Sequence, residues 1–143
     1  MRSVLLCLSL LLFSGCSSGD FPTAATTGRV ICEGQPVPHV MVFFEPLQSG
    51  KNALVGAQGR AIADPEGKFS ISTYGTNDGA VVGHHRVRVG PPHREDHPNF
   101  KCACVLNAEI DLMEVDIKKG QKNHFELVLK KKTGAEPKAL PER

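Results

Sequence analysis

Short alternating runs of apolar and polar residues are the feature that most restricts the fold of this chain. From Gly28 onward these runs are separated by Gly, Pro, Asn and Asp, and no window shows a sustained helical period. About seven short strands at near-regular spacing predict an all-β protein, an antiparallel β-sandwich. The candidate strands are 28–33, 40–45, 68–73, 85–89, 109–118 and 124–130, with weaker ones at 53–55 and 60–63.

Local patterns refine this assignment. Residues 40–45 are apolar on both faces, which predicts a central, buried strand. Asp64-Pro65-Glu66-Gly67 has the composition of a type I turn, so residues 60–73 are expected to form a hairpin. In 109–118 the alternation changes phase between Leu112 and Met113, which predicts a β-bulge or a chain break.

The N-terminal residues have a different character. Arg2 precedes an apolar run from Val4 to Phe13, which is too short to span a bilayer but suits the core of a signal peptide. The sequence Phe13-Ser14-Gly15-Cys16 resembles the lipobox of bacterial lipoproteins, although that family prefers Leu at the position of Phe13. The resemblance implies that residues 1–15 are removed and that Cys16 is acylated. Ordinary secretion and an uncleaved anchor are the alternatives.

The remaining chain divides into three parts. Residues 16–27 are rich in Ser, Thr, Gly and Ala and are expected to form a flexible lipidated tether. Residues 28–130 form the predicted sandwich, and 131–143 are expected to be a disordered tail. The net charge is +2, and loss of Arg2 with the leader lowers it by one to +1. Such a small charge gives no reason to expect a nucleic-acid partner.

A series of short motifs lies at 28–30, 34–37, 42–46, 64–69, 78–80 with Gly83, and 87–89. Their order and spacing resemble the transthyretin-like domain of carboxypeptidases, also called the carboxypeptidase regulatory-like domain. Together they extend from Gly28 to about Lys130, and the combination is similar to small standalone lipoproteins of planctomycete bacteria. The resemblance implies an Ig-like sandwich that acts as a binding or interaction module without catalytic machinery. His85 departs from the pattern, since the family usually has an aromatic residue there.

Three cysteines remain if Cys16 carries lipid and Cys7 leaves with the leader. In an oxidising compartment Cys32 can form a disulfide with Cys102 or Cys104, which leaves one thiol over. Alternatively, three thiolates can bind copper or zinc, or Cys32 can serve as a small core residue. The sequence leaves these possibilities open.

The histidines offer a second candidate metal site. His93 and His97 are four residues apart and could bind a metal with Glu95 or Asp96, but flanking prolines leave room for barely one helical turn. An exposed polar loop is the alternative. His84 is expected to be solvated, and His85 to be packed at a sheet end.

Enzymatic and sugar-binding functions are disfavoured. One transthyretin-like branch hydrolyses 5-hydroxyisourate and carries a C-terminal Tyr-Arg-Gly-Ser motif, whereas Tyr74 is the only tyrosine of this chain. No catalytic residues, metal or cofactor are therefore assigned. The chain has no Trp for stacking sugar rings, and residues 130–132 are expected to be a solvated lysine run.

The sequence predicts a lipid-anchored envelope protein with a non-catalytic β-sandwich. Its partners are expected to be the membrane, through the lipid, and an unidentified envelope protein or polymer. Ser17 after Cys16 favours the outer membrane, and the periplasmic face of the envelope is the broader expectation. The alternative is an envelope protein that binds a ligand or metal through Cys32, Cys102 and Cys104 or through the His93–His97 loop.

Overall fold

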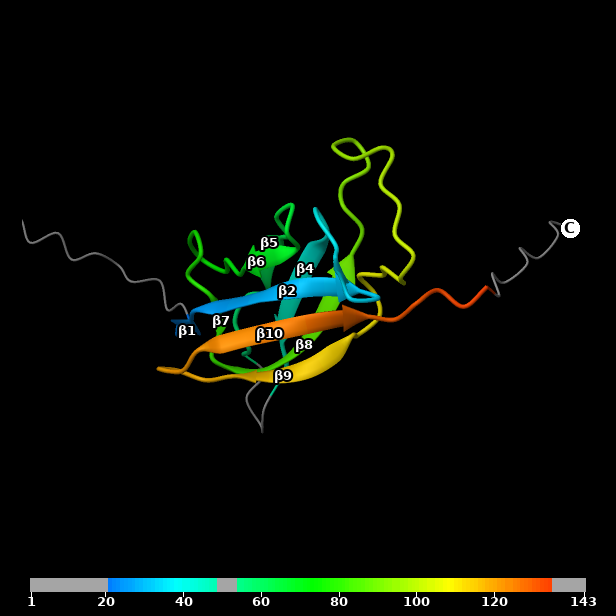
Figure 1. Cartoon of the computed structure of the whole chain (residues 1–143). Helices are drawn as coiled ribbons and strands as arrows, with labels where there is room; N and C mark the ends of the chain where they lie inside the picture. The colour runs from blue at the N-terminus through cyan, green and yellow to red at the C-terminus, as the bar shows by residue number, and fades with distance from the viewer. Residues whose placement is uncertain (1–20, 49–53, 135–143) are drawn as a thin grey trace, which may run out of the picture.

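The computed structural model describes residues 21–48 and 54–134 and confirms the predicted all-β fold (Figure 1). The predicted leader, Cys16 and residues 135–143 of the predicted tail lie outside the described residues. The strands are β1 (Thr23–Ala24), β2 (Thr26–Cys32), β3 (Gln35–Pro36), β4 (Met41–Pro46), β5 (Gly59–Ile62), β6 (Lys68–Ser70), β7 (Ala80–Val81), β8 (Gly83–Gly90), β9 (Met113–Ile117) and β10 (Asn123–Leu129).

Two four-stranded sheets face each other. The first has the order β10-β2-β3, with β6 also paired to β2, and the second has the order β5-β4-β8-β9. β1 and β7 form a separate two-stranded ribbon. All pairs are antiparallel except β10 and β2, which run parallel from Asn123↔Thr26 to Leu129↔Cys32. The expectation of a purely antiparallel sandwich was therefore wrong for this pair.

The core fills the space between the two sheets. Alternate residues of each strand point inward, because side chains on a strand alternate between its two faces. Phe44 is fully buried in the middle, and its ring lies 6.1 Å from that of Phe69 and 5.9 Å from that of Phe125. β4 lies between β5 and β8, as its apolar composition predicted, but only one of its faces is fully buried, since Met41 and Phe43 on the other face are half-buried. The buried positions of the strands include Val30, Val42, Val87, Val89, Val115, Ile117, Leu127 and Leu129.

The predicted turn at 64–67 is present, and the expected hairpin is formed in part. Arg60 and Ser72 form an antiparallel bridge, with Arg60 N donating to Ser72 O at 2.9 Å and Ser72 N to Arg60 O at 3.0 Å. A carboxylate oxygen of Asp64 accepts hydrogen bonds from the amides of Glu66 (2.9 Å) and Lys68 (2.8 Å), and Gly67 N donates to Asp64 O. β5 then pairs with β4 in the second sheet, whereas β6 pairs with β2 in the first. The two segments joined by the turn therefore contact each other at one bridge, while their longer pairings lie in different sheets.

The folded body begins earlier than expected. Residues 16–27 were predicted to be a flexible tether, but β1 and the first residues of β2 lie within this range. Thr23 and Ala24 pair with Val81 and Ala80, and the Thr26 hydroxyl, 1% exposed, donates to Ala24 O at 2.8 Å. β-Branched Thr residues favour a strand, and pairing with β7, which is distant in the sequence, orders this segment although its composition resembles a flexible linker.

The phase change between Leu112 and Met113 coincides with the start of β9. Residues 109–112 lie outside any strand, so the break, rather than a bulge, is what the structure contains. Of the weak candidate 53–55, Ala53 lies outside the described residues, and Val55 is not in a strand. At the C-terminal end, Lys132 N donates to Ala103 O at 3.0 Å, so the start of the predicted tail is attached to the body.

Candidate functional site

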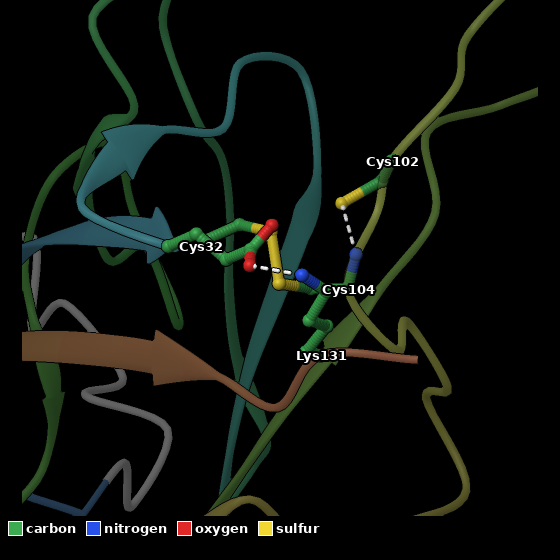
Figure 2. The surroundings of a disulfide bond; sticks show 5 residues. Cys32, Cys102, Cys104 and Lys131 are labelled. Atoms are coloured by element: carbon green, nitrogen blue, oxygen red, sulfur yellow. Dashed lines mark hydrogen bonds and ion pairs between the residues drawn. A yellow bond between two sulfur atoms is a disulfide. The ribbon is translucent and has the colours of Figure 1, made fainter. Parts of the chain in front are cut away.

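The three remaining cysteines lie at one end of the sandwich (Figure 2). Cys32 is the last residue of β2, and Cys104 lies in the long loop between β8 and β9. These two form a disulfide with a Cα–Cα distance of 5.9 Å across 72 residues of sequence. Cys104 is fully buried and Cys32 is 8% exposed, so the bond joins the loop to the core.

Backbone contacts fix Cys104 beside β2. Cys104 forms an isolated antiparallel bridge with Lys131, and Val105 N donates to Lys130 O at 2.8 Å. The Lys131 ammonium is 2.6 Å from the Glu33 carboxylate, next to Cys32, and this hydrogen bond raises the pKa of Lys131. The extension of β10 thus positions Cys104 as the partner of Cys32, a choice that the sequence left open.

Cys102 is a free, half-buried thiol. Its sulfur accepts a hydrogen bond from Cys104 N at 3.4 Å (Figure 2). Cys102 and Cys32 both line a shallow, open groove whose walls also include Pro36, Pro38, Phe100 and Lys101. Because Cys32 and Cys104 are joined, the three-thiolate metal site considered from the sequence is not formed. In residues 21–48 and 54–134, no cluster of three or more His, Cys, Asp or Glu side chains is arranged to hold a metal ion.

The two histidines considered as a metal pair do not act together. A single turn separates them, with His97 N donating to His93 O at 3.0 Å, as the flanking prolines led us to expect. The ring of His97 instead stacks on His39, with centroids 4.1 Å apart and an interplanar angle of 16°. His39 has a φ of 64°, an unusual conformation that sequence patterns gave no means of detecting.

A charged network covers part of the outer face of the second sheet. Glu45 of β4 accepts hydrogen bonds from Arg86 of β8, at 2.8 and 3.0 Å, and is 2.9 Å from Arg88. Arg88 also donates to Asp111 at 2.7 Å. The hydrogen bonds from Arg86 and the charge of Arg88 hold the pKa of Glu45 below its usual value. The alternation placed both arginines outward, but their carboxylate partners come from other segments.

Two adjacent histidines on β8 have opposite environments. Both ring nitrogens of His84 are bonded to carboxylates, Nε2 to Glu114 at 2.9 Å and Nδ1 to Asp116 at 2.8 Å. These bonds raise the pKa of His84, since only the protonated ring can donate from both nitrogens. His85 is fully buried against Phe44, and burial lowers the pKa of His85 despite a 2.6 Å bond to the Val81 carbonyl.

Other residues noted in the sequence are engaged in local contacts. The Tyr74 hydroxyl accepts a hydrogen bond from Ala57 N at 3.2 Å and so joins two loops. Of the lysine run 130–132, Lys131 forms the ion pair with Glu33. Within the part of the chain that the structure describes, no helix has the length and apolarity needed to cross a membrane.

The comparisons with known proteins return no match. No protein-family model, no curated protein and no solved structure is similar enough to this chain to assign it to a family.

Proposed function

We propose that this chain is a lipid-anchored protein of the bacterial cell envelope whose β-sandwich acts as a non-catalytic interaction domain. In this proposal the leader is removed before Cys16, the cysteine is acylated, and the sandwich stands at the outer membrane or the periplasmic face of the envelope. Its partner is an envelope protein or polymer.

The N-terminal sequence is the observation that carries the proposal. An apolar run from Val4 to Phe13 is followed by two small residues, Ser14 and Gly15, and then by Cys16. Each buried methylene of an acyl chain contributes about 0.8 kcal/mol to membrane binding, so two or three chains on one residue make release very slow.

The Cys32–Cys104 disulfide supports export, because such bonds persist mainly in oxidising compartments.

The early start of the folded body limits how far the sandwich can lie from the proposed anchor. Thr23, the first residue of β1, follows Cys16 by seven positions, and seven residues span at most about 25 Å. A lipid on Cys16 would therefore hold the sandwich close to the membrane surface.

The contacts of the ionisable side chains support a structural or interaction role. Glu45, Arg86 and Arg88 are bonded within the charged network, both ring nitrogens of His84 are bonded to carboxylates, and His85 is buried in the core. The three-thiolate alternative is disfavoured by the bond between two of its members. The resemblance of the motifs to the carboxypeptidase regulatory-like domain agrees with an interaction module.

Substitution of the anchor cysteine tests the proposal. The full chain and Cys16→Ala are expressed in a bacterium that processes lipoproteins and is fed an alkyne fatty acid. We expect the wild type in the membrane fraction with the label, and Cys16→Ala in the soluble fraction without it. Cys102→Ala is the matched control and should behave as the wild type. A labelled, membrane-bound Cys16→Ala protein would show that the anchor lies elsewhere.

A further inference from the structure

The free thiol of Cys102 lies beside a groove that Cys32 of the disulfide also lines. Its sulfur is 3.4 Å from Cys104 N, and standard bond lengths then place it within about 8 Å of the Cys104 sulfur. The groove beside it is lined by Cys32 and Cys102, whereas Cys104 is fully buried and does not line it. Figure 2 shows the three sulfurs together at this end of the molecule. The groove thus places Cys102 and the Cys32 side of the bond along one surface.

The backbone around Cys102 is less constrained than that around Cys104. Residues 103–105 are held by the extension of β10, through Lys132 N to Ala103 O and Val105 N to Lys130 O. Among the described residues, the amides of Lys101 and Cys102 donate no backbone hydrogen bond. Segments with few backbone hydrogen bonds open at low free-energy cost, so Cys102 can approach Cys32 without unfolding the sheets.

From this arrangement we infer that Cys102 exchanges with the Cys32–Cys104 disulfide, so that the protein interconverts two internal disulfides, Cys32–Cys104 and Cys32–Cys102. The exchange would move the covalent attachment of the β8–β9 loop by two residues. This inference does not depend on the lipid anchor, because the chemistry requires only the three cysteines of the sandwich.

The reaction needs no external oxidant or reductant. The Cys102 thiolate attacks the Cys32 sulfur, a bond forms between them, and the Cys32–Cys104 bond breaks. Cys104 leaves as a thiolate and takes up the proton that Cys102 released, so the products are one disulfide and one thiol, as before. Attack on the Cys104 sulfur would instead join Cys102 to Cys104 across a single residue, a strained arrangement in which Cys32 is left free.

Disulfide mapping of the whole chain tests the inference. The protein, purified without reducing agent, is incubated at pH 8, quenched in acid to remove thiolates, unfolded and alkylated with a maleimide. Trypsin cleavage sites place Cys32 in the peptide 30–51 and both other cysteines in the peptide 102–118. Fragmentation within the second peptide then shows whether Cys102 or Cys104 carries the alkyl group.

We expect the wild type to contain mainly Cys32–Cys104, with about 0.1–10% of the molecules as Cys32–Cys102, the usual population of a minor state. A map with Cys32–Cys104 alone would overturn the inference, and so would a Cys102–Cys104 bond. Cys7 and Cys16 do not confuse the result, because both lie outside these two peptides, in the tryptic peptide 3–29.

Two variants provide a second, matched measurement. Cys104→Ala leaves Cys32 and Cys102, and we expect these to form a disulfide in a glutathione redox buffer. Cys102→Ala is the control and should retain Cys32–Cys104 with no second species. A Cys104→Ala protein with the circular dichroism of a folded sheet but two free thiols would show that the sulfurs do not meet. If Cys104→Ala does not fold, the disulfide mapping of the wild type tests the inference by itself.

Discussion

Reduction of the Cys32–Cys104 disulfide should destabilise the sandwich severely. The bond closes a loop across 72 residues and joins the end of β2 to the long β8–β9 loop. Cross-linking stabilises a fold chiefly because it restricts the unfolded chain, and the effect grows with the length of the closed loop. A 15-residue loop contributes about 3 kcal/mol and a 100-residue loop about 4.7 kcal/mol, so about 4 kcal/mol is expected here.

This loss is large compared with the total stability of a small domain. Single domains unfold with a free energy of about 5–15 kcal/mol, so the reduced protein is expected to be marginally stable. For a domain of about 110 residues, each kcal/mol changes the melting temperature by about 4 °C. Reduction should therefore lower the melting temperature by about 15 °C.

Guanidinium unfolding followed by circular dichroism measures this difference. The oxidised wild type, the wild type in a phosphine reductant, and the double variant Cys32→Ala/Cys104→Ala are compared. Cys102→Ala, with and without the reductant, is the control for the free thiol. If reduction changes the free energy of unfolding by less than about 1 kcal/mol, the loop-closure reasoning fails for this protein.

Two further predictions concern the backbone and the histidines. Gly79→Ala should lower the free energy of unfolding by about 2 kcal/mol or more in a melting experiment, because Gly79 has a φ of 91° and an added Cβ would overlap the Ala24 carbonyl. The control Gly120→Ala should lower it by only about 1 kcal/mol, because Gly120 has a φ of 71° but an added Cβ would meet open space. The raised pKa of His84 means that its bonds stabilise the fold below pH 6.5, and that this stability is lost as the pH rises through the native value. The lowered pKa of His85 acts in the opposite sense, since its stability is present above pH 6.5 and is lost as the pH falls through the native value. Urea unfolding from pH 5 to 8 should show that His84→Gln loses stability mainly at low pH and that His85→Phe becomes less sensitive to acid; pH-independent differences would contradict these assignments.

Much of the fold could be predicted from local sequence patterns. The period of two placed Phe69, Ile71, Val87 and Leu127 inward, and each is buried. The composition of residues 64–67 identified a turn, and the phase change before Met113 marked the start of β9. These features depend on residues adjacent in the chain, so the sequence alone carries the information.

Pairing between strands could not be obtained in the same way. Alternation shows which side chains point inward, but it does not show that β10 lies parallel to β2 or that β5 and β6 belong to different sheets. Likewise, the Thr-rich residues 23–27 resemble a tether until β7 and β6 pair with them. These choices depend on contacts between segments distant in the sequence.

The cysteine site also combines features predictable from the sequence with one that depends on contacts between distant segments. From the sequence, Cys32 was a candidate for a small core residue and for a disulfide with Cys102 or Cys104, and either disulfide leaves one of these two as a thiol. Only the tertiary structure decided which one, because the extension of β10 holds Cys104, through Lys131, against the end of β2. A side chain's periodicity is a property of its own strand, whereas its partner is set by the path of another segment through space.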